Sequence, residues 1–137
     1  MKIHTTNYYN TFIEVAEDTK ADCGTEPPVK SDQKTVAALQ YELIVKNPYI
    51  YTSDDVLFEV FARRNDLTDD AYPEARETFF SKGQPCLRAS PLTKTYGFGV
   101  HYNAEGKIAI YGMDSPVYEQ MLADEKVQKL KAMKSKR

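Results

Sequence analysis

The chain has 137 residues, 42% hydrophobic and 28% charged, a composition typical of one soluble globular domain and too apolar for a disordered protein. No apolar run approaches the roughly 20 residues that a membrane-spanning helix needs, and the first residues lack the apolar segment of a signal peptide. The two cysteines, Cys23 and Cys86, lie far apart and form no CxxC motif. We therefore expect a single domain over residues 1–137, free thiols, a cytoplasmic location and no membrane partner.

The net charge of −2 hides an asymmetry along the chain. A basic C-terminal tail, residues 126–137, carries +6 and no acid, so residues 1–125 carry −8. Such a tail can bind nucleic acid or anionic lipid. However, the acidic body repels a phosphate backbone, and no aromatic residue alternates with the lysines of the tail. We therefore expect the tail to be solvated and do not expect a nucleic-acid partner.

The N-terminal third of the chain predicts one short strand and one helix. Residues 8–16 contain a β-like run, and residues 17–32 form a polar stretch with glycine and prolines that is typical of a loop. An apolar stripe over residues 33–46 predicts the first helix, which should end at Asn47-Pro48 because proline cannot continue it.

Two further helices are predicted in the middle of the chain. In the first, over residues 52–64, Thr52 is a candidate N-cap residue, and the acidic side chains of Asp54 and Asp55 suit the positive end of a helix. The second, over residues 73–82, starts with a proline in its first turn and ends before a glycine.

A β region is predicted after these helices. Residues 84–90 read as a strand, and residues 96–102 and 107–112 read as a hairpin. The connection suits a three-residue loop in which Gly106 has positive φ.

The hairpin register follows from this loop. It places Tyr102 opposite Ile108 and separates an apolar face from a mixed face that carries His101 and Tyr111. If the predicted strand 84–90 joins the hairpin, its polar side chains lie on the same mixed face.

The C-terminal part of the chain predicts more helix. Ser115-Pro116 should open a fourth helix, and Asp124 should cap a last basic helical segment through Val127, Leu130 and Met133. The expected fold class is therefore α+β, with three to four helices packed on a small antiparallel sheet made of the hairpin 96–102/107–112 and the strand 84–90.

Four stretches of the chain together resemble a known bacterial family. They are HTTNY at 4–8, YTSDDVLF at 51–58, FFSKGQPCLRASPL at 79–92 and LKAM at 130–133. On these motifs the chain is identified as a member of the family called domain of unknown function 6157. The resemblance covers almost the whole chain and implies a bacterial, single-domain cytoplasmic protein. It implies no activity, ligand or catalytic residue, because none is defined for the family.

An acid-free segment is the strongest indication of a binding site. Residues 78–104 contain no aspartate or glutamate, although the chain has 20 acidic residues. Basic side chains there lack a local counter-charge, and an arginine can hold a phosphate or carboxylate through two parallel hydrogen bonds. We expect an anion site formed by Arg88, Ser90, Lys94, His101 and Tyr111. The alternative is that Arg88 pairs with an internal acid such as Glu14 or Glu59, which would leave no place for a ligand.

Cysteine chemistry is a second hypothesis. If residues 84–90 form a strand beside the hairpin, Cys86 and His101 share a face, and a Cys–His pair supplies a nucleophile and a base. The alternative is a buried structural cysteine, and the sequence identifies no third residue that would orient His101. The spacing of the two cysteines and two histidines matches no zinc module, so neither a metal nor a cofactor is expected.

These patterns favour a small cytoplasmic binding or accessory protein with a pocket for an anionic small molecule near residues 81–102. Two other classes remain open. One is an enzyme with a Cys86 nucleophile and a His101 base. The other is a protein-interaction module that has no pocket.

Overall fold

The computed structural model describes residues 4–28 and 35–134. Four strands and five α-helices make up most of this part of the chain, with two short 3-10 helices at Asp69–Ala71 and Leu87–Ala89. The elements in chain order are β1 (Thr11–Glu14), α1 (Val36–Lys46), α2 (Ser53–Arg64), α3 (Tyr72–Phe79), α4 (Pro91–Lys94), β2 (Phe98–Tyr102), β3 (Ile108–Gly112), α5 (Pro116–Ala123) and β4 (Gln128–Lys131).

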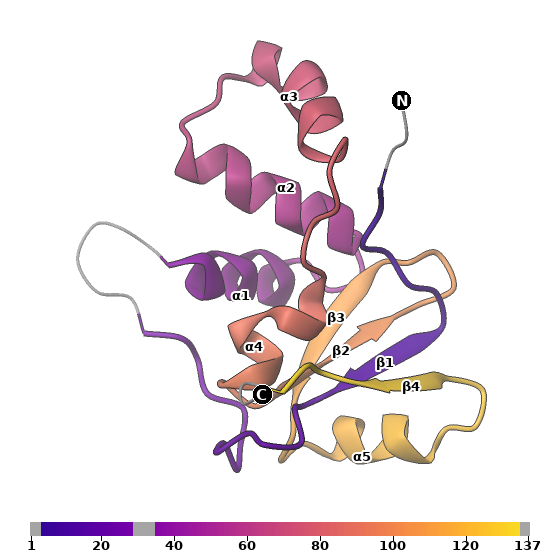
Figure 1. Ribbon diagram of the computed structural model, residues 1–137. Coiled ribbons are helices and arrows are strands. Elements are labelled where there is room, and N and C mark those ends of the chain that lie inside the picture. The colour runs from indigo at the N-terminus through magenta and orange to yellow at the C-terminus, as the bar shows by residue number, and fades with distance from the viewer. Residues whose placement is uncertain (1–3, 29–34, 135–137) are drawn as a thin grey trace.

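The four strands form one sheet with the order β3-β2-β1-β4 (Figure 1). The β1–β2 and β2–β3 pairs are antiparallel, whereas β4 runs parallel to β1. The expected α+β fold with a small, mostly antiparallel sheet is therefore confirmed.

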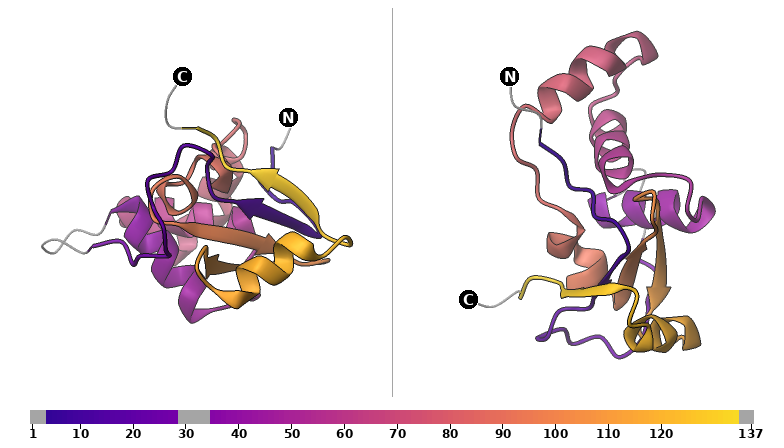
Figure 2. Two further views of the ribbon diagram at one scale, coloured as in Figure 1. Left: turned by 90° about the horizontal axis from the view of Figure 1, so that it is seen from below. Right: turned by 90° about the vertical axis from the view of Figure 1, so that its right-hand side faces the viewer.

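Helices cover both faces of the sheet, as the views in Figures 1 and 2 show. On the outer face, the ring of Tyr118 from α5 packs edge-on against Phe12 of β1, with ring centroids 5.0 Å apart. The inner face packs against α1, α2 and α4, and the main core lies there. Its buried members include Ile13, Leu39, Leu43, Ile44, Val56, Leu87, Leu92, Val100, Tyr102 and Ile108.

A second, smaller core joins α2 to α3, which extend together beyond the sheet (Figure 1). Phe58, Ala62 and Phe80 are buried there, with Phe79 and Tyr72 packed around them. Because these rings meet largely edge to face, the α2–α3 pair is held by its own aromatic contacts rather than by the sheet.

The helix starts follow the predicted capping chemistry. Thr52 caps α2 in a reciprocal arrangement: its hydroxyl accepts from the Asp55 amide, and the Asp55 carboxylate accepts from the Thr52 amide. Ser115 caps α5 in the predicted position. The first helix begins at Val36, and residues 33 and 34 of the predicted helix lie outside the described residues. None of the helices described is long and apolar enough to cross a membrane.

The hairpin prediction is confirmed in register and in loop geometry. Tyr102 pairs with Ile108, and Asn103 N–H donates to Lys107 O at 2.9 Å. Gly106 has a φ of 80°, the left-handed conformation that the loop requires and that glycine adopts without a steric cost.

The predicted strand 84–90 is wrong. This segment is irregular as far as Cys86, then forms the 3-10 helix Leu87–Ala89 and leads into α4. Pro85 and Pro91 carry no N–H group to donate to a neighbouring strand, and the Ser90 hydroxyl accepts from Leu92 N–H to cap α4. The alternation of apolar and polar residues reflects burial of Leu87 under the helices, not strand pairing.

The predicted C-terminal helix is also wrong, because residues 128–131 form β4. Main-chain hydrogen bonds from Gln128 to Asn10 and from Ala132 to Glu14, both 2.9 Å, attach this segment to β1. Residues 128–131 of the basic tail are therefore paired with the sheet. Lysines are side chains that commonly protect an edge strand from further pairing.

Candidate functional site

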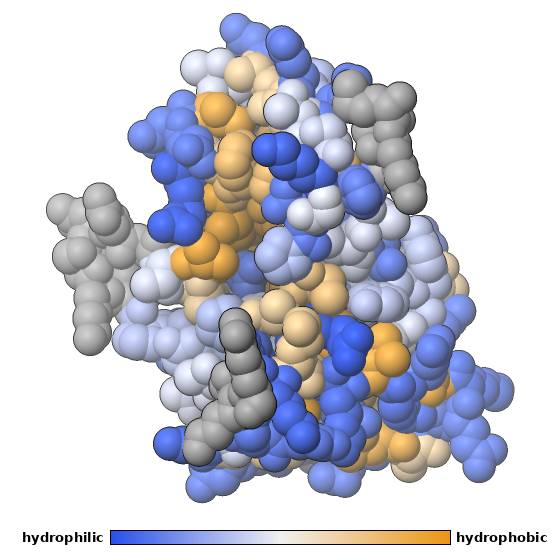
Figure 3. Space-filling view, viewed as in Figure 1, coloured by the Kyte–Doolittle hydropathy of each residue, from blue (hydrophilic) through white to orange (hydrophobic). Residues whose placement is uncertain are grey.

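A groove of about 530 Å³ opens between α1, α2 and the segment from Gln84 to Pro91. Figure 3 shows a strip of hydrophobic surface over α2 that runs from α3 towards the beginning of α1. The volume lies within the usual range for small-molecule sites. Most of the wall is apolar and is formed by Val36, Leu57, Val60, Phe61, Phe79, Pro85, Ala89 and Pro91.

Gln40 of α1 is the most buried polar residue of this groove, with 3% of its surface exposed. Its Oε1 atom accepts a hydrogen bond of 2.6 Å from Ser90 Oγ. The same Ser90 oxygen accepts from Leu92 N–H, so its own hydrogen is available for Gln40. Within the described part of the chain, no group accepts a hydrogen bond from Gln40 Nε2.

Two neighbouring arginines at the end of α2 have different surroundings. Arg63 Nε pairs with Glu59 Oε1 at 3.2 Å on the same helix. Arg64 lines the groove, and no carboxylate of the described residues forms an ion pair with it. Gln84, on the opposite wall, already donates from Nε2 to Phe79 O at 2.7 Å. The groove thus combines an apolar wall with one amide donor and one guanidinium, neither of which has a side-chain partner among the described residues.

Of the predicted anion-site residues, Ser90 alone lines this groove. Arg88 turns away from it, and its Nε donates to Lys131 O at 2.8 Å. Neither Glu14 nor Glu59 forms an ion pair with Arg88, and Glu59 is instead paired with Arg63.

Lys94 ends α4 as a half-buried side chain, without an ion pair to any described residue. It is not part of the groove wall. The acid-free segment therefore does not gather its basic residues around one site.

His101 and Tyr111 do come together, on the outer face of the sheet. The hydroxyl of Tyr49 lies 2.8 Å from His101 Nδ1 and 2.8 Å from the Tyr111 hydroxyl. Burial lowers the pKa of His101, while the charge of Asp124 opposes this shift. The sequence does not predict that Tyr49 joins His101 and Tyr111, because Tyr49 reaches β3 from the α1–α2 loop with a φ of 60° and no local pattern indicates this.

Cys86 does not meet His101, so the predicted catalytic pair is not formed. His101 and Tyr102 are successive residues of β2 and point to opposite faces of the sheet. Cys86 lies on the Tyr102 side, with Sγ 3.9 Å from the Tyr8 hydroxyl. Across the described ranges, no three His, Cys, Asp or Glu side chains converge in a way that could hold a metal ion.

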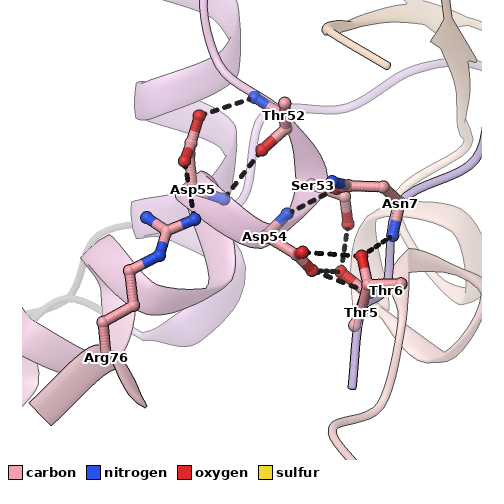
Figure 4. A network of polar contacts seen from close by, with 8 residues as sticks. All are labelled: Thr5, Thr6, Asn7, Thr52, Ser53, Asp54, Asp55 and Arg76. Carbon is pink, nitrogen blue, oxygen red and sulfur yellow. Dashed lines mark hydrogen bonds and ion pairs between the residues drawn. The ribbon is translucent and has the colours of Figure 1, made fainter. Parts of the chain in front are cut away.

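A polar network anchors the N-terminal segment to the start of α2 (Figure 4). The buried Asp54 carboxylate accepts from Thr5 Oγ1 at 2.6 Å, and from Thr6 N and Thr6 Oγ1 at 2.7 Å each. Asn7 Oδ1 accepts from the Asp54 amide at 3.0 Å. Two of the sequence motifs, at 4–8 and 51–58, thus meet in one structural contact.

Beside this network, Arg76 of α3 pairs with Asp55 at 2.9 Å, and its guanidinium lies 5.5 Å from the centre of the Phe80 ring. These contacts lock α3 against the start of α2. The carboxylates of Asp54 and Asp55 are therefore both committed to internal partners.

Comparison with known proteins agrees with the four sequence motifs. The model of a family of unknown function, DUF6157, matches residues 3–137. The searches of curated proteins and of solved structures gave no match. Because the family model covers nearly the whole chain, the protein belongs to the family of unknown function DUF6157.

Proposed function

We propose that the protein binds a small organic acid, with an apolar body and one carboxylate, in the groove between α1, α2 and residues 84–91. This retains the expected anionic ligand but moves its site away from Arg88 and His101. The two unpaired cysteines, Cys23 and Cys86, support the accompanying proposal of a cytoplasmic location.

The observation that carries this proposal is the free amide of Gln40. Gln40 is 3% exposed, and its Nε2 atom, at the surface of the groove, has no acceptor among the described residues. Polar groups that are largely buried are nearly always hydrogen-bonded, so a donor on a groove wall that lacks a protein acceptor is a candidate ligand contact. Ser90 Oγ donates to Oε1, so Nε2 is the end of the amide that remains available to a ligand. A carboxylate or carbonyl oxygen in the groove would supply the missing acceptor.

The other groove residues support a ligand with both apolar and anionic parts. Phe61, with 36% of its surface exposed, and Phe79 offer ring surfaces that water contacts poorly. Arg64 at the end of the same wall supplies a positive charge that forms no ion pair with the described residues. An inorganic anion would use only the charge, whereas an aromatic or branched acid would also cover the rings.

The proposal is tested by adding phenylacetate, hexanoate and 4-methylpentanoate to the ¹⁵N-labelled protein, with the matching alcohols as uncharged controls. We expect amide shifts at Gln40 and along the segment 84–91, and tighter binding of each acid than of its alcohol. Shifts confined to other surfaces, or equal affinity for acids and alcohols, would overturn the proposal.

Two matched pairs of variants separate the groove from general effects. Gln40→Met removes the free donor and should weaken acid binding at least about 10-fold, because hydrogen bonds to charged groups contribute about 1.5–3 kcal/mol. Gln84→Met changes the same residue type in the same groove, but its amide is already bonded, so affinity should stay within about 2-fold. Arg64→Gln should weaken binding about 2- to 5-fold, as exposed charge pairs contribute at most about 1 kcal/mol, whereas Arg63→Gln should not.

A further inference from the structure

The second feature of interest is a thiol on the inner side of the sheet. Cys86 is half-buried, and its Sγ atom lies 3.9 Å from the Tyr8 hydroxyl. Its own carbonyl accepts from Ala89 N–H at 3.0 Å, which fixes the start of the 3-10 helix and the position of the side chain. The preceding residue, Pro85, lines the groove between α1 and α2, whereas Cys86 does not, so the thiol lies outside that groove.

A buried hydroxyl without a partner faces this thiol. Tyr102 is fully buried, and in the described part of the chain its hydroxyl is the one buried side-chain oxygen or nitrogen that forms no hydrogen bond. Its charged and polar neighbours are Ser53, Cys86, Tyr8 and Asp54. Ser53 lies close enough to the Tyr102 hydroxyl to oppose the rise in its pKa that burial causes, but Ser53 Oγ is hydrogen-bonded to Thr6 Oγ1 at 2.9 Å.

Two tyrosines and one arginine lie near the thiol: the Tyr8 hydroxyl is 3.9 Å from Sγ, Tyr102 interacts electrostatically with Cys86, and Arg88 lies next to the Tyr8 hydroxyl. The rings of Tyr8 and Tyr102 pack edge to face, with centroids 5.4 Å apart. Burial and the neighbouring Cys86 raise the pKa of Tyr8. Arg88 faces the Tyr8 hydroxyl, and its positive charge opposes this rise. No described carboxylate forms an ion pair with this guanidinium. An oxygen atom bound to Sγ would therefore meet phenolic donors and an unneutralised positive charge.

We infer that Cys86 is a site of reversible oxidation by hydroperoxides, and that Tyr102 and Arg88 stabilise the product. The sulfur attacks the terminal peroxide oxygen, the O–O bond breaks and an S–O bond forms. The thiol proton passes to the leaving oxygen, so the hydroperoxide is reduced to an alcohol and the thiol is oxidised to a sulfenic acid. Two equivalents of a small thiol reverse the change, through a mixed disulfide with release of water.

The chain contains its own control, because Cys23 is also free and half-buried, whereas its Sγ atom lies 3.7 Å from the Thr25 hydroxyl. The intact protein is treated with hydrogen peroxide in the presence of dimedone, which traps sulfenic acids, and each cysteine is quantified by peptide mass spectrometry. We expect at least about 10-fold more trapping at Cys86 than at Cys23 in the folded protein, and similar trapping at both in urea. Equal trapping in the folded protein would overturn the inference.

Variants test the stabilising residues separately. Tyr102→Phe removes a hydroxyl that forms no hydrogen bond, so the variant should still fold. The amount of sulfenic acid trapped at Cys86 should fall at least about 3-fold, and the amount of sulfinic acid should rise. Arg88→Met should have the same effect, whereas Tyr96→Phe, at a half-buried ring away from the thiol, should not change trapping. Wild-type trapping in both Tyr102→Phe and Arg88→Met would refute the role given to these side chains.

Discussion

Replacing Asp54 should remove the anchor of the N-terminal segment. Asp54 is 9% exposed, and its carboxylate accepts two hydrogen bonds of 2.7 Å from the buried donors of Thr6 and one of 2.6 Å from Thr5. Each hydrogen bond to a charged group contributes about 1.5–3 kcal/mol, and a buried donor left unpaired costs its desolvation. Thr5 can turn to water, so Asp54→Ala should destabilise the fold by about 3–5 kcal/mol through Thr6.

Asp54→Asn gives the internal comparison, because it keeps the shape and one acceptor oxygen. It should lose about 1–2 kcal/mol, a loss between wild type and alanine. Urea denaturation measures both values, and a lower midpoint with an unchanged slope shows that stability alone has changed. Native-state hydrogen exchange should show faster exchange of the Thr6 amide. A loss below about 1 kcal/mol for Asp54→Ala, or an asparagine variant as unstable as alanine, would refute the reasoning.

Three further predictions concern the backbone, the pH dependence and the core. Gly97 and Gly106 both have positive φ, of 79° and 80°. At Gly97, an added Cβ atom would lie 2.2 Å from the carbonyl oxygen of Cys23. At Gly106, it would lie 2.9 Å from an atom of the Tyr9 ring. Gly106→Ala should therefore cost about 1–2 kcal/mol and Gly97→Ala more, and equal losses in thermal melts would contradict this. Burial lowers the pKa of His101 in the folded protein. The His101 side chain therefore takes up a proton at a higher pH in the unfolded chain than in the folded protein. The free energy of unfolding should consequently fall as the pH drops below about 6.5. Urea titrations between about pH 7.5 and 5.5 should show a weaker pH dependence in His101→Gln, and an unchanged slope would count against the burial argument. Leu92→Ala should cost about 2–5 kcal/mol in the same urea assay, because the side chain is fully buried, and a loss under about 1 kcal/mol would show that the site collapses around it.

Local signals in the sequence predicted most of the helices and the hairpin. Thr52 marked the start of α2, and the three-residue loop ending in Gly106 marked the hairpin register. Capping and turn geometry depend only on residues that are close in the sequence. Such features do not depend on contacts with residues that are distant in the sequence.

Features that depend on distant partners were not predictable in this way. Residues 84–90 alternate like a strand, yet two prolines and the Ser90 cap favour a turn, and residues 128–131 become a strand because β1 offers a free edge. The groove was missed for the same reason. Gln40 belongs to a predicted helix, but its meeting with Ser90, 50 positions later, is a tertiary contact.

The place of β1 inside the sheet has a consequence for biosynthesis. Thr11 pairs with Tyr102 on one side and with Gln128 on the other, so both ladders join segments that are far apart in the chain. Phe12 and Ile13 are fully buried in the native state. During translation they are synthesised long before the partner strands β2 and β4. Pairing over such sequence distances is slow, because loop closure precedes the gain from contacts. The nascent chain therefore carries an uncovered apolar strand until β2 emerges, and β1 stays open on its second edge until residues 128–131 have been made.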